Sequence, residues 1–218
     1  ILTIAFIIVV CNAYNLIDGI DGQAGTQALA VFLFLAGFLF HLIYATDVLH
    51  QDTFFANANF WMIAFVAIIG SLIGFLVFNW QPAKIFMGDT GSLFIGTLIA
   101  LSIIMSMNYS GADPILIYDY EIKAKILVFP MFFFLPFADT LRVFVSRIRR
   151  GKSPFSADKT HIHHFLLRTG YSHQRTAITN FVIQVVVSLI SIIVAFLISD
   201  LFYIIYIVAI WVIYVVVL

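Results

Sequence analysis

Charged residues are scarce in this sequence of 218 residues. Only 10% of the residues are charged, whereas 63% are hydrophobic, and the 24 phenylalanines outnumber the 11 basic and 11 acidic residues combined. A soluble domain is about a quarter charged. The composition therefore excludes a soluble globular domain, a disordered chain and a nucleic-acid-binding protein. It predicts an integral membrane protein.

Cysteine is rare in the sequence, and a signal-peptide start is lacking. The single cysteine, Cys11, lies in an apolar run, cannot form an intrachain disulfide and is expected to serve in packing. The chain begins with Ile1 inside this run, without the charged region and small-residue cleavage site of a signal peptide. We therefore expect the chain to be a fragment that lacks N-terminal spans.

What is abundant is apolar sequence in runs long enough to cross a bilayer, which takes about 20 helical residues. The runs predict an all-α, multi-pass transmembrane helix bundle that forms a single domain over residues 1–218. About seven spans are expected, at 1–11, 26–45, 60–78, 92–107, 122–145, 177–198 and 201–218.

The basic residues predict the orientation of this bundle. The connections at about 12–25, 79–91 and 146–176 fall on one side of the membrane, and the connections 47–59, 108–121 and 199–200 fall on the other. The second group has no Lys or Arg. Basic residues gather on the cytoplasmic side, so the first group is predicted to be cytoplasmic; its basic residues are Lys84, Arg147, Arg149, Arg150, Lys152, Lys159, Arg168 and Arg175.

The first cytoplasmic segment reads NAYNLIDGIDG at 12–22. Its two Asp-Gly steps are typical of turns, and a capped turn is one interpretation. If the segment is helical, Asn12 and Asn15 lie on one side, as do Asp18 and Asp21. Such a face is suited to a hydrated cation or to a sugar nucleotide.

The second segment reads FNWQPAKIFMGDTGS at 78–92 and leads into an apolar span. Asp89 suits a helix N-cap, and the same helix start exposes backbone N–H groups that favour phosphate. A carboxylate beside a phosphate indicates a bridging Mg²⁺. Lys84 adds a positive charge, and Phe86 or Trp80 could stack on a base.

The third segment is basic and ends in three histidines. Arg149, Arg150 and Lys152 are interpreted as an anchor to anionic lipid. A zinc site is disfavoured because no Cys or Glu lies near the histidines. Histidines beside basic residues are better suited to a diphosphate; these histidines are His161, His163 and His164, and Asp139 is expected to pair with Arg142.

Together with RIRRGKSPFSADKTHIHH at 147–164, these segments resemble the polyprenyl-phosphate N-acetylhexosamine-1-phosphate transferases of glycosyltransferase family 4. The resemblance is to the undecaprenyl-phosphate GlcNAc-1-phosphate transferase branch, which starts O-antigen of lipopolysaccharide, enterobacterial common antigen or teichoic acid linkage units. The muramoyl-pentapeptide transferase branch typically carries three consecutive histidines instead of HIHH.

The resemblance implies that a UDP-N-acetylhexosamine transfers its sugar-1-phosphate to polyprenyl phosphate and releases UMP, with Mg²⁺, or Mn²⁺ in its place. It implies a multi-pass protein of the bacterial inner membrane with a cytoplasmic active site, and it allows a homodimer. The implied catalytic residues are Asp89, Asp18, Asp21 and His164, with Asp89 and then Asp21 as metal ligands. The implied substrate-binding residues are Asn12, Asn15, Asn79, Lys84, Phe86, Arg142, Arg147, His161 and His163.

The resemblance also implies an aspartate-rich motif on an earlier loop, and residues 1–11 carry no charge. The metal and lipid-phosphate site would therefore be completed by sequence outside this chain. Two alternatives remain open. One is a phospho-MurNAc-pentapeptide transferase of peptidoglycan synthesis, and the other is a non-catalytic membrane transporter or assembly protein.

Overall fold

The protein is a bundle of helices, seen here in a computed structural model that describes residues 1–45, 52–111, 116–117, 120–121, 128–153 and 160–217. Lys159 and parts of the connections 47–59 and 108–121 lie outside these residues. The helices are α1 (Leu2–Ile17), α2 (Gln23–Ala45), α3 (Asp52–Asn79), α4 (Gly88–Gly111), α5 (Val128–Met131), α6 (Phe134–Arg149), α7 (Ile162–Arg168), α8 (His173–Leu197) and α9 (Asp200–Val217).

The predicted all-α membrane bundle is confirmed. Four helices, α2, α3, α4 and α8, are long and apolar enough to cross a membrane, and α1 and α9 are shorter apolar helices. Six of the seven predicted spans coincide with one helix each. Two short strands, β1 (Leu116–Ile117) and β2 (Tyr120–Glu121), pair antiparallel beyond the end of α4.

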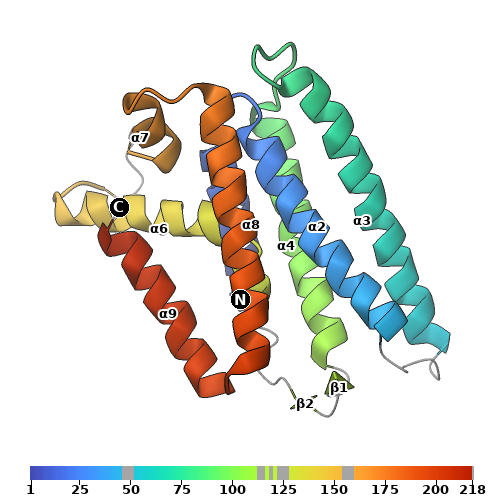
Figure 1. Cartoon of the computed structure of the whole chain (residues 1–218). Coiled ribbons are helices and arrows are strands. Elements are labelled where there is room, and N and C mark those ends of the chain that lie inside the picture. Colours follow the sequence, from blue (N-terminus) through green and yellow to red (C-terminus); the bar gives the residue numbers. More distant parts are fainter. Residues whose placement is uncertain (46–51, 112–115, 118–119, 122–127, 154–159, 218) are drawn as a thin grey trace.

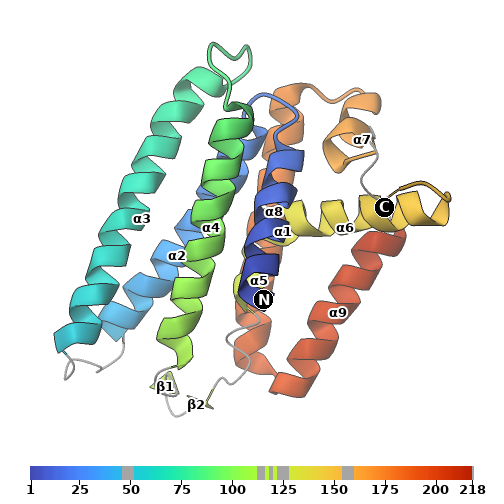
Figure 2. The ribbon, with the colours of Figure 1, turned by 180° about the vertical axis from the view of Figure 1, so that it is seen from behind.

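The long helices stand side by side, so that their ends form two opposite faces of the bundle (Figure 1). The strands and the start of α9 lie at one end. The start of α2, the end of α3, the starts of α4 and α8, and the short helix α7 lie at the other end. The view from behind shows that α1 also finishes at this second end (Figure 2). The first two segments that the sequence singled out, and the histidines of the third in and just before α7, are therefore gathered at one end. The end of α6, where the third segment begins, lies nearer the middle of the bundle (Figure 1).

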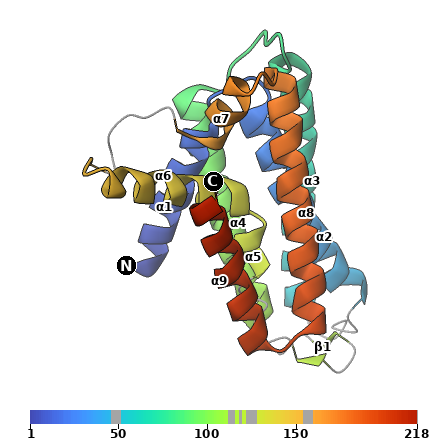
Figure 3. The same cartoon turned by 60° about the vertical axis from the view of Figure 1, so that its left-hand side comes forward.

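The predicted fifth span, 122–145, is wrong as a single helix. In its described part, α5 ends at Met131, two residues form a turn, and α6 begins at Phe134. Pro130 and Pro136 flank this turn, and each removes a backbone N–H from the helical ladder. After the break, α6 lies across the bundle, nearly perpendicular to α8 (Figures 1 and 3).

The backbone groups freed by this break are satisfied by α8. The side-chain oxygen of Gln184 accepts a hydrogen bond from the Leu135 N–H at 2.8 Å, and its Nε2 donates to the Met131 carbonyl at 2.9 Å. The hydroxyl of Ser188 donates to the same carbonyl at 3.1 Å. Irregular backbone at membrane depth persists only where protein groups satisfy it. This explains the polar residues on the buried face of an otherwise apolar helix.

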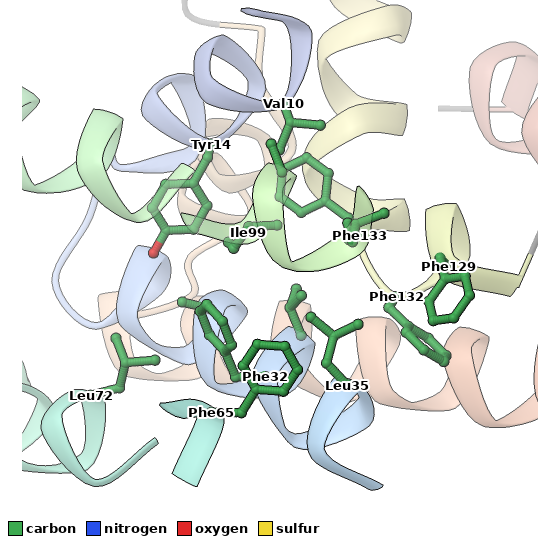
Figure 4. Packing of buried hydrophobic residues seen from close by; sticks show 14 of the residues in the cluster. Val10, Tyr14, Phe32, Leu35, Phe65, Leu72, Ile99, Phe129, Phe132 and Phe133 are labelled. Atoms are coloured by element: carbon green, nitrogen blue, oxygen red, sulfur yellow. The ribbon is translucent and has the colours of Figure 1, made fainter. Parts of the chain in front are cut away.

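The core is aromatic and joins α1, α2, α3, α4 and α5 (Figure 4). Tyr14 is fully buried, stacks on Phe133 with ring centroids 6.5 Å apart, and donates its hydroxyl to the Ala24 carbonyl at 2.6 Å. The bond ties the end of α1 to the start of α2. The run Phe132–Phe134 is buried and therefore packs inside the bundle.

Cys11 has the packing role expected of it. A Cβ atom at Gly96 would lie 2.9 Å from the Cys11 Cα atom, so α1 and α4 approach closely at this point. Small residues permit such approaches between membrane helices. The Cys11 sulfur also lies 3.1 Å from the Thr97 hydroxyl.

Replacing Gln184 with Leu is expected to destabilise the protein by about 1–3 kcal/mol, because the Leu135 N–H loses its buried acceptor. Thermal unfolding in detergent, followed by tryptophan fluorescence, measures the effect. Val186→Leu, at an exposed position on the same helix, is the control and should leave the unfolding temperature unchanged. Equal unfolding temperatures for Gln184→Leu and the control would contradict this account of the helix break.

Candidate active site

Three segments far apart in the sequence meet at one end of the bundle. The first loop is joined to the second by the Gly22 N–H, which donates to the Asn79 side-chain oxygen at 3.0 Å. The first loop also contacts the histidine segment, because a Cβ atom at Gly19 would lie 2.5 Å from Nε2 of His163. Figure 3 shows α7, which carries this segment, beside the end of α1.

Asp89 lies in the first turn of α4 with its side chain exposed. Its Oδ1 accepts a hydrogen bond from Nδ2 of Asn15 at 3.2 Å, and the same nitrogen donates to the Ser92 hydroxyl at 2.7 Å. Gly88, just before it, has a φ of +65°, a conformation that glycine adopts without strain. Asn15, in the last turn of α1, therefore orients an accessible carboxylate.

Asp18 lies close enough to Asp89 for the two charges to interact. Burial, and then the negative charge of Asp89, raise the pKa of Asp18 to about 6. Two neighbouring carboxylates disfavour each other's ionised forms. A cation between them, or the binding of a proton, would relieve this repulsion.

The pair Asp18 and Asp89 fits a magnesium ion that also binds substrate. Among the described residues, no three His, Cys, Asp or Glu side chains gather into a group able to hold a metal ion. Mg²⁺ is usually held by one or two carboxylates, with substrate phosphates and water completing its shell. Two neighbouring carboxylates have the chemistry of that protein share, and a metal-binding role for the pair stays a prediction.

Asp21 has a different environment. Its Oδ2 accepts a hydrogen bond from the Ala83 N–H at 3.4 Å and lies 3.7 Å from Nδ1 of His173. The carboxylate thus faces the second loop and the start of α8. A metal-binding role for Asp21 stays a prediction.

The second loop places its predicted residues in two different positions. Asn79 is buried, and besides accepting from Gly22 it donates Nδ2 to the Ile85 carbonyl at 2.8 Å. It holds the loop together in this structure, and its contact with substrate stays a prediction. Lys84 and Phe86 are exposed, Phe86 at 74%, so a charge and an aromatic face are available to a ligand.

The three histidines have unequal positions. Nδ1 of His161 lies 2.8 Å from Oδ2 of Asp139, and both residues are buried. His163 is 1% exposed; burial, and then the neighbouring His164 and His161, lower its pKa to about 4, so it is neutral at pH 7. His164 is partly exposed. Of the three, His164 is the most exposed, and its contact with a ligand stays a prediction.

The other predicted polar residues include two arginines, of which Arg147 is buried and Arg142 is partly buried. Arg142 bonds Asp139 at 2.7 Å, which confirms the expected pair, and it also donates to the Thr160 carbonyl. Asn12 is exposed on α1 and donates to the Ile8 carbonyl at 2.7 Å. Substrate contacts by Arg142, Arg147 and Asn12 stay predictions.

Some residues of the site escaped the sequence analysis. Gln81 accepts a hydrogen bond from the Gln174 N–H at 3.2 Å, and Nε2 of Gln174 donates to the Gln81 carbonyl at 2.8 Å. With His173, this pair joins the start of α8 to the first two loops. The partners are 93 positions apart, and no local pattern indicates them. Only the polar run just before the apolar part of α8 was a signal.

Comparison with known proteins identifies the family. The sequence model of glycosyl transferase family 4 matches residues 1–107, which include the first two segments of the site. The chain belongs to glycosyl transferase family 4.

Relatives within the family carry the comparison beyond residue 107. The chain is 35% identical over 187 residues to a decaprenyl-phosphate N-acetylglucosaminephosphotransferase of Mycobacterium tuberculosis, covering 82% of this chain and 43% of that protein. It is 33% identical over 195 residues to a probable undecaprenyl-phosphate N-acetylglucosaminyl 1-phosphate transferase of Bacillus subtilis, covering 86% and 46%.

A third relative is named for a different activity. The chain is 32% identical over 201 residues to a phospho-N-acetylmuramoyl-pentapeptide-transferase of Chloroherpeton thalassium, covering 87% of this chain and 49% of that protein. The chain thus spans less than half the length of these three family 4 proteins.

In this family 4 chain, Gly19→Ala is expected to lower stability by about 1–3 kcal/mol, because the added methyl group overpacks against the buried His163 ring. Thermal unfolding measures the change. In a His163→Ala background the same substitution should cost much less, since the ring is gone. Gly74→Ala, where a Cβ atom meets nothing within 4 Å, is the control. Equal costs in both backgrounds would show that Gly19 does not contact His163.

Asp18→Asn is expected to raise the unfolding temperature at pH 7.5 in metal-free buffer, because it removes a charge that burial and Asp89 disfavour. The folded-state pKa, about 6, is above the ordinary value of 3.8. Wild-type stability therefore falls as the pH rises from about 4 to 6, and the advantage of the variant should shrink at pH 5. Unfolding curves across this pH range, with and without Mg²⁺, test the expectation. An advantage that does not change with pH would contradict it.

Proposed function

We propose that the complete protein transfers GlcNAc-1-phosphate from UDP-GlcNAc to a polyprenyl phosphate, undecaprenyl phosphate in particular, and releases UMP. The observation that carries this proposal is the carboxylate pair Asp18 and Asp89, held by Asn15 at one end of a membrane bundle. The proposal agrees with the names of two relatives, both N-acetylglucosamine phosphotransferases. The reaction would be the first membrane step of a cell-envelope polysaccharide.

The reaction joins two phosphates at the membrane surface. A phosphate oxygen of the lipid attacks the β-phosphorus of the nucleotide sugar, a new P–O bond forms, and the bond between that phosphorus and the oxygen bridging to the α-phosphorus breaks. UMP leaves with the bridging oxygen. Because both reactants are anions, the main contribution of the protein is positioning and charge stabilisation.

The described residues suit these tasks. Phe86 offers an exposed face for the uracil ring, and Lys84 offers a positive charge for the phosphates. We propose His164, which is partly exposed, as a donor to the diphosphate or sugar, and Asn12 and Asp21 as further polar contacts. Asn15 keeps the carboxylate of Asp89 in place. The lipid tail would lie along the apolar outer surface of the helices.

Magnesium, or manganese in its place, would supply positive charge that offsets the charges of the two phosphates when bound. Asp89 and Asp18 are the residues proposed to hold it, with Asp21 as a further candidate. The raised pKa of Asp18, caused first by burial and then by the charge of Asp89, supports this assignment. The setting proposed is the bacterial inner membrane, with the site on the cytoplasmic side, where the basic residues gather, and a homodimer is compatible with it.

A second candidate is the transfer of phospho-MurNAc-pentapeptide to the same lipid. The 32% identity to a protein named phospho-N-acetylmuramoyl-pentapeptide-transferase favours this candidate. The chemistry is shared, and only the sugar differs. A non-catalytic role in transport or assembly is the remaining alternative, and in that case the carboxylates at the site would be dispensable.

Exchange of radiolabelled UMP into UDP-GlcNAc tests the proposal, using membranes that contain the protein from its complete gene, polyprenyl phosphate and Mg²⁺. Asp89→Asn is expected to lower exchange by about 100-fold or more, because a metal contact contributes several kcal/mol and each ~1.4 kcal/mol is tenfold. EDTA should have the same effect. Asp200→Asn, the same change at the other end of the bundle, should retain exchange.

Exchange with UDP-MurNAc-pentapeptide but not with UDP-GlcNAc would favour the second candidate. Full exchange by Asp89→Asn would contradict the role of this carboxylate. A folded, inserted protein without exchange for any UDP-N-acetylhexosamine would leave the non-catalytic alternative.

A further inference from the structure

Asp139 is a buried carboxylate whose hydrogen-bond partners, among the residues that the structure describes, belong to its own helix or to the histidine segment. It lies in α6 and is 2% exposed. Its Oδ2 lies 2.8 Å from Nδ1 of His161, and its Oδ1 accepts the Ile162 N–H at 3.0 Å. Arg142, one turn along α6, donates to the same Oδ1 at 2.7 and 3.3 Å.

A carboxylate in this position is costly unless it is well paired. Burial by itself raises the pKa of Asp139, but the hydrogen bonds and charges of His161 and Arg142 outweigh burial and lower it below the ordinary value. The group is therefore ionised. It is too deeply buried to touch a substrate, so its contacts with the histidine segment are what explain it.

The backbone on both sides of His161 is fixed to α6. Arg142 donates a hydrogen bond to the carbonyl of Thr160, and Asp139 accepts one from the N–H of Ile162. The side chain of His161 is held as well. The His161 ring stacks parallel to the His163 ring, at 6° with centroids 5.8 Å apart, and His163 lies 4.3 Å from His164. A change in the orientation of His161 would therefore be passed to its neighbours.

We propose that Asp139 is a positioning residue, which fixes the tautomer and orientation of His161 and thereby the geometry of the whole histidine segment. This inference rests on the proposed function, because the segment is taken to serve the sugar-phosphate transfer. Asp139 itself touches no reacting atom.

The tautomer follows from the chemistry of the pair. An ionised carboxylate only accepts hydrogen bonds, so Nδ1 of His161 must carry a proton. In the neutral ring, Nε2 is then left as an acceptor, and no described residue bonds to it. Through Gly19, against which His163 packs, the same chain of contacts reaches the loop that carries Asp18 and Asp21. Asp139 thus acts on the site without being exposed to it.

Asp139→Asn separates positioning from simple packing. The amide has the same shape and retains an oxygen for the Ile162 N–H, but it presents an NH₂ group to His161. A donor at that point makes Nδ1 an acceptor, so the proton of the neutral ring moves to Nε2. The ring would keep its place while its outward nitrogen changes from acceptor to donor.

The first measurement needs no enzyme assay. Nitrogen NMR of the full protein with ¹⁵N-labelled histidine distinguishes a protonated Nδ1 from a protonated Nε2, with His161→Gln used to assign the signal. The proposal requires Nδ1 of His161 to be protonated in the wild type and the proton to move to Nε2 in Asp139→Asn. A wild-type neutral ring protonated on Nε2 would overturn it.

The second measurement is the kinetics of UMP release. Asp139→Asn is expected to lower kcat by about 10- to 100-fold, the usual cost of removing a group that orients a functional histidine, while KM changes little. In a His161→Ala background it should cost nothing further. Thr140→Val is the control, because among the described residues the Thr140 hydroxyl bonds the Pro136 carbonyl of its own helix and no other group.

The outcomes separate this inference from the proposed function. Wild-type kcat in Asp139→Asn with a shifted tautomer, or a full additional loss in the His161→Ala background, would reduce Asp139 to a packing residue and overturn the inference. A wild-type protein inactive with every donor would contradict the proposed function instead, and the NMR result would still show whether Asp139 sets the tautomer of His161.

Discussion

The requirement that every backbone group buried in a membrane finds a partner determines the shape of this protein. The chain breaks between α5 and α6, and Gln184 with Ser188 on α8 satisfies the groups set free. Only because of this pairing can α6 lie across the bundle. The helix that lies across then carries Asp139 and Arg142 to the place where the histidine segment returns. Polar residues on one helix thus support a site built largely by others.

A second constraint is electrostatic. The site gathers carboxylates at the end of an apolar bundle, where Asp18 and Asp89 disfavour each other's charge. Hydrogen bonds hold the surroundings of these carboxylates. Asn15 donates to Asp89, and Gln174 bonds Gln81 of the second loop. The repulsion between these negative charges lowers the stability of the protein, and a bound cation would offset that loss. Sites that bind anions through a metal commonly combine a loss of stability with the ability to bind the ligand.

Much of this organisation could be predicted from the sequence. Hydropathy located six of the helices, and the motifs located the three segments that meet. The fifth span was wrong because an average of hydropathy over 122–145 gives no weight to Pro130 and Pro136. Such an average also cannot show that Phe132–Phe134 are buried inside the bundle. Local patterns could pair Asp139 with Arg142, three positions apart. They could not show that His161 shares the same carboxylate, or that Gly19 is small because His163 lies against it.

The contact between α1 and α4 gives the chain a chemical probe of its own. Its one cysteine is buried where the two helices touch, with the sulfur against the Thr97 hydroxyl. A thiol reagent can modify Cys11 only when these helices separate. The labelling rate therefore reports how often the end of α1, which carries Asn15, moves away from the start of α4, which carries Asp89. Because no cysteine has to be introduced, this motion can be timed in the unaltered sequence.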